Sequence, residues 1–331
     1  MAPRETPAAP APRSYVRRGG LDVLPAPWRC EDVEMHAFYV AGELAALQRL
    51  CDRCLNEPSR GHLHYQPDSH YVIVTFQNLR GLHSIAPGCE DRGTHTYTEA
   101  AFWVMTSARD ASGTRVGGPT LMIPYIFASD GLAVATGREV YGYPKEHAVV
   151  RMPGDGGGDG DYVVEALAVP CYAPGAPAVA GSEIMRCRRT NSSALAGLGH
   201  TAMELGEDLL SVVRQGGIDG SALALMRDFI SMMLHKKLGL VFLRQFRATA
   251  ATSGYDLQSV VGSSLEPLVI NSMCLLKGRY ELILPPLDSH PIAADMGFIT
   301  IDGKIDIMMG VRMKLAFDMC AGQTLWPAPA S

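Results

Sequence analysis

An alternation of apolar and polar residues near the C-terminus constrains the fold of this 331-residue chain more than any other feature. Every second residue between Gly303 and Phe317 is apolar, namely Ile305, Ile307, Met309, Val311, Met313 and Leu315. A period of two places these side chains on one face of a long β-strand, because a helix would scatter them around its axis. The sequence therefore predicts a sheet with an extensive buried face.

Short apolar runs separated by turn residues predict further strands along most of the chain. They occupy 28–40, 71–79, 101–106, 121–128, 132–136, 148–152, 161–166, 240–243, 268–270 and 280–284. Between the first two, 42–55 has the apolar spacing of a helix. The strands do not alternate regularly with helices, which argues against a doubly wound fold. No glycine-rich nucleotide-binding motif follows a strand, so no nucleotide cofactor is expected.

The chain is expected to form a single α+β domain over 23–331, preceded by an Ala/Pro-rich disordered tail over 1–22. Within the domain, 190–237 predicts a helical hairpin, since two stretches of helical apolar spacing are separated by Gly216 and Gly217. Its methionines, Met226, Met232 and Met233, are compatible with an adaptable pocket wall. Ordinary packing or a subunit interface is the more common use of such a stripe, and we expect a homo-oligomer.

Composition excludes several classes of function. A net charge of −5 gives no basic surface for nucleic acid. No apolar run approaches the roughly 20 residues that span a membrane, and the first residues lack the apolar core of a secretory signal, so a cytoplasmic protein is expected. The eight cysteines include one CxxC pair, Cys51 and Cys54, with no second pair to complete a metal site. Reduced thiols and no bound metal are expected.

The glycine- and aspartate-rich segment 154–161 resembles a calcium-binding loop at first sight. An EF-hand requires glutamate at its twelfth position, and Ala166 stands there instead. A hairpin tip between two strands is therefore the preferred interpretation.

Lys145 is the strongest candidate for a reactive side chain. It follows Tyr143 and Pro144, with apolar residues at 131–135 before it and at 148–150 after it. A neutral lysine amine condenses with a ketone to give an imine, which then accepts an electron pair from a neighbouring bond. An ordinary lysine ammonium, with a pKa of ~10.4, does not react in this way, but burial in an apolar site favours the neutral form. Most lysines beside a proline are solvated, so the segment alone leaves both interpretations open.

The run from Gly137, Arg138 and Glu139 to Pro144 and Lys145 resembles the signature of the acetoacetate decarboxylase family. Two further segments match in order and approximate spacing: Tyr97-Thr98-Glu99, and the apolar strand that ends in Phe76-Gln77. The resemblance covers about 33–151 and, more loosely, the chain from 279 to the C-terminus. It implies a mainly antiparallel, barrel-like or cone-like sheet of the acetoacetate decarboxylase type, to which the helical hairpin would be added.

The resemblance also implies roles for individual residues. Lys145 would form the imine, and Glu99 would transfer protons or orient the imine. Gln77 would hold the substrate by a neutral hydrogen bond, Tyr143 would form the pocket wall, and Arg29 lies in the region where the family binds the substrate carboxylate. Although Arg138 and Glu139 match the signature, they are expected to form an internal ion pair that shapes the turn.

Two positions depart from the family pattern. Glu146 stands where decarboxylating members have a second lysine, and Gln77 stands where a carboxylate is usual. A carboxylate close to the amine would favour the ammonium form of Lys145. Adjacent residues of a strand point to opposite faces, however, so Glu146 is expected to point away.

Three classes of function remain open at this stage, and the first two require a small-molecule keto acid. A lyase that decarboxylates a β-keto acid comes first. An aldolase–dehydratase or cyclase that uses the same lysine on an α-keto acid is second, and a non-catalytic ligand-binding protein is third.

Overall fold

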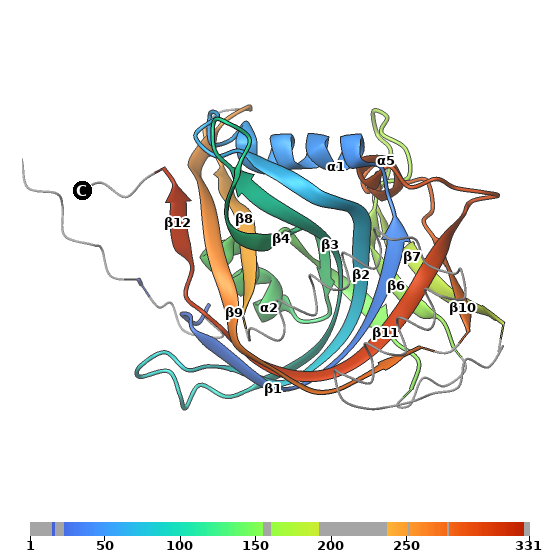
Figure 1. The fold of residues 1–331 in the computed structure, drawn as a ribbon, viewed down its shortest axis with the longest axis horizontal. Helices are drawn as coiled ribbons and strands as arrows, with labels where there is room; N and C mark the ends of the chain where they lie inside the picture. The colour runs from blue at the N-terminus through green and yellow to red at the C-terminus, as the bar shows by residue number, and fades with distance from the viewer. Residues whose placement is uncertain are drawn as a thin grey trace, which may run out of the picture.

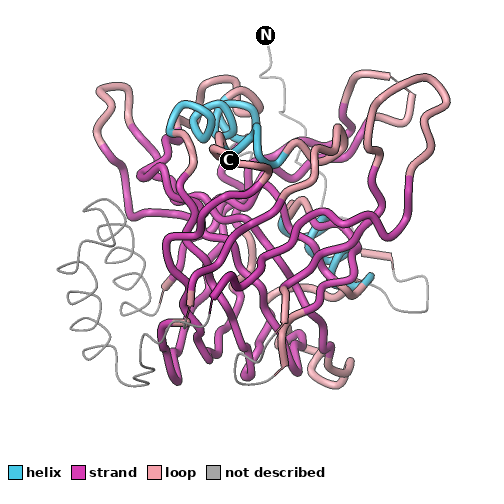
Figure 2. The backbone as a smooth tube through the Cα atoms, turned by 90° about the vertical axis from the view of Figure 1, so that its right-hand side faces the viewer, coloured by secondary structure: helices cyan, strands magenta, loops and turns pink. Residues whose placement is uncertain are grey.

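The computed structural model describes residues 15–16, 23–154, 160–191, 237–250, 252–276 and 278–327. Strands form most of this body (Figures 1 and 2). In chain order the elements are β1 (Trp28–Ala41), α1 (Leu44–Cys51), the π-helical turn η1 (Asp52–Asn56), β2 (Tyr65–Ser84), β3 (His95–Arg109), β4 (Arg115–Ala128), α2 (Gly131–Thr136), the π-helical turn η2 (Gly137–Tyr141), β5 (Lys145–Arg151), β6 (Tyr162–Ala168), β7 (Val179–Asn191), β8 (Leu238–Arg247), β9 (Tyr255–Leu275), β10 (Arg279–Ile283), α5 (Ile292–Met296), β11 (Lys304–Met319) and β12 (Gln323–Trp326).

The strands form one mixed sheet that closes on itself in two places. β4, β3, β2, β1 and β11 lie side by side in that order. The free edge of β4 pairs in parallel with β8 over 120–122 and with β5 over 126–128. The edge of β11 that does not pair with β1 pairs with β10 over 304–307 and with β9 over 311–319. One ring therefore closes through β8 and β9, and a second ring of nine strands closes through β5, β6, β7 and β10.

Three of the strands shared by the two rings, β1, β2 and β3, are buried on both faces along their central residues. In β1, Ala37 and Tyr39 point into the first ring, whereas Phe38 and Val40 point into the second. Side chains that alternate along a strand thus enter two different cores. This explains why β1, β2 and β3 contain continuous apolar runs, which are unusual for an antiparallel sheet with one solvated face.

Short helices complete the second core. α1 and α5 lie together at one end of the molecule (Figure 1). Leu47 and Leu50 of α1 and Ile292 and Met296 of α5 are all buried in that core. The helical segment formed by α2 and η2 packs against the first core, in which Tyr141 is buried, and the interior of the first ring contains a pocket.

Most of the strands predicted from the sequence are confirmed, and so is the helix at 42–55, which forms α1 and η1. The prediction of a strand at 132–136 was wrong, since this segment is the helix α2. Its first free amides are capped by Asp130, whose carboxylate accepts a hydrogen bond of 2.6 Å from Ala133 N. A short apolar run does not distinguish a buried helix from a strand. The Asp130 cap favours the helix here.

The expected sheet of the acetoacetate decarboxylase type was described as mainly antiparallel, and the sheet is mixed because β4 has two parallel partners. The predicted helical hairpin at 190–237 lies almost entirely outside the described residues, as does most of the predicted tail at 1–22. The segment 154–161 joins β5 and β6, which pair antiparallel as a hairpin requires, but 155–159 themselves lie outside the described residues.

Gly142 allows the chain to turn from η2 towards β5. Its φ of 89° lies in the left-handed region, which favours glycine. A Cβ atom at this position would lie 2.5 Å from Cα of Arg244 on β8. The turn that presents Lys145 therefore depends on a residue without a side chain.

We expect Gly142→Ala to lower the free energy of unfolding by at least about 2 kcal/mol more than Gly113→Ala does. Gly113 is the matched control, because it also has a positive φ, 81°, but open space around its Cα. Urea denaturation of the two variants measures the difference. Equal losses of stability would contradict the close approach of β8 to Gly142.

Candidate active site

Lys145 is the first residue of β5, and its side chain is buried at the edge where β5 joins β4. Residues of the Gly-Arg-Glu segment contact it directly. A Cβ atom at Gly137 would lie 2.8 Å from Cδ of Lys145, so the glycine makes room for the lysine stem. The Arg138 guanidinium donates a hydrogen bond of 3.2 Å to the Lys145 carbonyl. Arg138 thus holds the lysine backbone, which corrects the expectation that its main partner would be Glu139.

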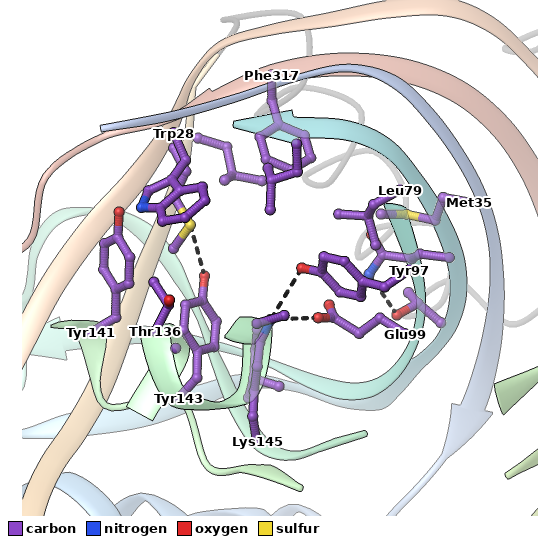
Figure 3. Close-up of a pocket in the computed structure, with 18 of the residues that line it drawn as sticks. Trp28, Met35, Leu79, Tyr97, Glu99, Thr136, Tyr141, Tyr143, Lys145 and Phe317 are labelled. Carbon is purple, nitrogen blue, oxygen red and sulfur yellow. Dashed lines mark hydrogen bonds and ion pairs between the residues drawn. The ribbon is translucent and has the colours of Figure 1, made fainter. Parts of the chain in front are cut away.

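The Lys145 ammonium lies against two residues of β3. Its Nζ is 2.7 Å from Oε2 of Glu99 and 3.3 Å from the hydroxyl of Tyr97 (Figure 3). Glu99 and Tyr97 are two residues apart on one strand, so both point to the same face. All three side chains are less than a tenth exposed. Burial, followed by the nearby Glu99 carboxylate, raises the pKa of Tyr97 well above its usual value, so the phenol stays neutral.

These groups face a cavity of about 90 Å³ inside the first ring. A site that holds one water needs roughly 10–15 Å³ on the same measure, so this cavity accommodates a small organic molecule. Its lining is mainly aliphatic and aromatic. Lys145, Glu99 and His95 are the only acidic or basic side chains among the lining residues that the structure describes.

Gln77 and Tyr143, two residues singled out from the sequence, both line this cavity. Gln77 of β2 lies directly opposite Glu99 of β3, and its amide donates a hydrogen bond of 3.3 Å to Thr75. The Tyr143 ring centroid lies 5.4 Å from the Lys145 ammonium, within the range of a cation–π contact. The structure therefore brings Lys145, Glu99, Gln77 and Tyr143 together.

Arg29 lies outside this group. Its guanidinium forms two hydrogen bonds of 2.7 Å with the carboxylate of Asp318, and the side chain is 43% exposed. Trp28, the preceding residue, lines the cavity instead. Strand alternation explains the difference, because neighbouring residues of β1 face opposite sides. The geometry gives no support to Arg29 as a binder of the substrate carboxylate.

Glu146 points away from the amine, as expected from strand alternation. Its carboxylate is 3.1 Å from Nε2 of the buried His290, and it is absent from the described lining of the cavity. The Nδ1 of the same imidazole lies 2.8 Å from the hydroxyl of Ser289. Glu146 is thus held on the other face of β5.

Sequence reasoning missed several residues of the site. Tyr97 was part of a matching segment but was not assigned to the site, although its position two residues before Glu99 signals a shared face. Trp28, Thr136 and Tyr141 also line the cavity. Nothing in their local sequence indicates this, because they meet only when β1 and the α2–η2 segment come together in the fold.

Comparisons with solved structures show what this arrangement resembles. The acetoacetate decarboxylase of Legionella pneumophila superposes with a TM-score of 0.59 at 14% identity, over 98% of this chain and 94% of that one. The fold is that of acetoacetate decarboxylase. No protein-family model matches the sequence, and no curated protein does. The resemblance predicted from the sequence is therefore confirmed at the level of the fold.

Other proteins share this fold. The enduracididine biosynthesis enzyme MppR, complexed with the condensation product of pyruvate and imidazole 4-carboxaldehyde, superposes with a TM-score of 0.56 at 14% identity, over 96% of this chain and 98% of that one. An acetoacetate decarboxylase-like enzyme from Sphingomonas wittichii RW1 gives a TM-score of 0.52 at 12% identity, over 92% of this chain and 94% of that one. The acetoacetate decarboxylase fold thus accommodates more than one named enzyme.

Two further features are absent from the residues that the structure describes. No helix in this part of the chain has the length and hydropathy needed to cross a membrane. In the same residues, no cluster of histidine, cysteine, aspartate and glutamate has an arrangement that could hold a metal ion.

We expect Glu146→Lys to change the pH at which trapping of a ketone by Lys145 is half-maximal by less than about one unit. The side chain at 146 lies on the opposite face of β5 from the amine. Glu99→Gln is the matched comparison, since it alters the carboxylate that contacts the amine, and it should shift the midpoint further. The pH dependence of borohydride trapping with a ketone measures both. A shift of two or more units in the Glu146 variant would place this residue in the active site.

Proposed function

We propose that this protein is a Schiff-base enzyme in which Lys145 forms an imine with the ketone of a small keto acid. The observation that carries the proposal is the contact of 2.7 Å between a buried amine and a buried carboxylate, Glu99, at the wall of a mainly apolar cavity. A lysine at this place has access to a ligand but little access to water. That environment suits a carbonyl condensation in which water must leave.

Glu99 is positioned to manage the protons of this condensation. Transfer of a proton from the ammonium to Glu99 removes two charges from an apolar site and frees the nucleophilic amine. The amine attacks the ketone carbon, and the resulting carbinolamine loses its hydroxyl as water with a proton from Glu99. The product is a protonated imine, which withdraws electrons from the adjacent carbon.

Decarboxylation of a β-keto acid is the first candidate reaction. The carbon–carbon bond to the carboxylate breaks, its electron pair moves into the imine to give an enamine, and carbon dioxide leaves. Protonation of the enamine carbon and hydrolysis of the imine then return the ketone product and free Lys145. A carboxylate in an apolar cavity without a guanidinium partner is poorly stabilised, which favours its loss as a neutral gas.

An aldol or dehydration reaction through the same imine is the second candidate. Glu99 favours it, because a carboxylate beside the imine nitrogen is suitably placed to remove a proton from the adjacent carbon. The resulting enamine would attack an aldehyde. A fold relative, MppR, was solved with the condensation product of pyruvate and an aldehyde, which supports this alternative by analogy.

We expect borohydride reduction in the presence of a keto acid to add the mass of the reduced adduct to the peptide that contains Lys145. Lys145→Ala and Lys145→Arg should both abolish the adduct; the arginine variant preserves a cationic partner for Glu99. Lys304→Ala is the control, because Lys304 is half-exposed, pairs with Glu281 at 3.6 Å and does not line the described cavity. Mass spectrometry of the digested protein locates the adduct. Labelling of another lysine would refute the proposal, and carbon dioxide release separates the two reactions.

Glu99→Gln should reduce turnover by about 10²–10⁴-fold, as expected for the loss of a group that transfers protons in the reaction. Slow imine formation should persist, because Lys145 remains in place. Steady-state kinetics together with a thermal melt separate lost chemistry from lost folding. An unchanged turnover number would assign Glu99 a purely structural role.

A further inference from the structure

Three residues that line one wall of the cavity each contain a buried polar atom without a hydrogen-bond partner. The atoms are Nε1 of Trp28, Oγ1 of Thr136 and the hydroxyl oxygen of Tyr141. The three residues are between 2% and 6% exposed, and all line the cavity that contains Lys145. They lie on the side of Tyr143, whereas Tyr97 and Glu99 lie on the other side of Lys145 (Figure 3).

This grouping is distinctive within the molecule. Buried polar groups in native proteins are nearly always hydrogen-bonded. The only other unpartnered buried side-chain atom among the described residues is Nε of Arg109, whose guanidinium already bonds to Asp68. The other buried polar side chains among the described lining residues have partners, for example Trp103, whose indole N–H donates a hydrogen bond of 2.7 Å to Thr75. Three unpaired groups on one wall therefore indicate a place for a polar part of the ligand.

The chemistry of the three atoms indicates what that part is. An indole N–H only donates, so it needs an acceptor, while the two hydroxyl groups both donate and accept. Burial raises the pKa of Tyr141 well above its usual value, so its phenol remains a neutral donor. An oxygen atom with lone pairs would satisfy the indole and at least one hydroxyl.

The charges of the cavity favour an uncharged oxygen over a carboxylate. Lys145 is already paired with Glu99, and Arg29 is bound to Asp318 elsewhere. The partly buried His95 is the only other basic side chain among the described lining residues. A carboxylate against the three neutral donors would be a buried charge without a cation, which is costly, whereas a hydroxyl or carbonyl oxygen would not be.

We propose that Trp28, Thr136 and Tyr141 form a subsite for an uncharged hydroxyl or carbonyl oxygen of the substrate, on the chain that extends from the ketone away from the bond that breaks. The substrate class is then a keto acid whose far end carries a neutral oxygen. The inference deepens the proposed function, on which it relies for the position of the ketone at Lys145.

Three methyl ketones of matched chain length test the subsite: 5-hydroxypentan-2-one, hexan-2-one and 4-oxopentanoate. They place a hydroxyl, a methyl group or a carboxylate at the same distance from the ketone. We expect the hydroxy ketone to half-saturate borohydride trapping at a concentration about tenfold lower than either of the others, equivalent to about 1.4 kcal/mol. Equal half-saturation, or tighter binding of 4-oxopentanoate, would overturn the subsite.

Paired variants assign the preference to individual residues. Trp28→Phe and Tyr141→Phe should each reduce the preference for the hydroxy ketone to about threefold or less. Trp103→Phe and Tyr143→Phe are matched controls in the same cavity, because the Trp103 N–H and the Tyr143 hydroxyl already have partners in Thr75 and the Met319 sulfur. The controls should retain the preference, even if trapping as a whole becomes weaker. Loss of the preference in all four variants would contradict the assignment.

A second pair of ligands separates failure of the subsite from failure of the proposed function. Pentane-1,4-diol and hexan-2-ol cannot form an imine, and their binding to the unmodified protein is measurable by ligand-detected NMR. Tighter binding of the diol than of hexan-2-ol would support the subsite. If no ketone is trapped in the same protein, the imine is refuted but the subsite is not. Trapping of all three ketones without preference, together with equal binding of the two alcohols, would support the imine and refute the subsite.

Discussion

The contact between Lys145 and Glu99 is the interaction on which the functional account of this molecule depends. It places a cation and an anion 2.7 Å apart in a site that is nearly closed to water. Removal of one partner from such a pair generally leaves an uncompensated buried charge, at a cost of about 3–5 kcal/mol. The stability of the fold therefore also depends on keeping both residues together. Water exclusion and proton exchange within the pair are the properties that imine chemistry requires.

The fold creates this contact by joining strands that are distant in the sequence. β3 supplies Glu99 from the wall that the two rings share, and β5 supplies Lys145 at the first residue of its pairing with β4. Residues further along β5 on the face of Lys145, His147 and Val149, are exposed. The amine therefore enters the cavity only at the point where the second ring meets the first. Gly137 and Gly142 fix this point by allowing close approach of the lysine stem and of β8.

Much of this arrangement could be predicted from the sequence. A period-two pattern identified β11, short apolar runs between turn residues identified most other strands, and the Gly-Arg-Glu to Pro-Lys segment identified Lys145. Alternation also predicted that Glu146 would point away, where His290 binds it. Other features depend on long-range contacts. The strand predicted at 132–136 is a helix capped by Asp130, and Arg29 faces Asp318 because the register of β1 turns Trp28 inward. The polar wall formed by Trp28, Thr136 and Tyr141 exists only in the assembled ring, so no local pattern could reveal it.

A crystal structure of the protein after borohydride reduction with a keto acid tests the central claim most directly. The account predicts continuous electron density from Nζ of Lys145 into the cavity of the first ring, with the Glu99 carboxylate within hydrogen-bond distance of the new secondary amine. An unmodified Lys145 beside a non-covalently bound ligand, or an adduct on a lysine outside this cavity, would contradict it.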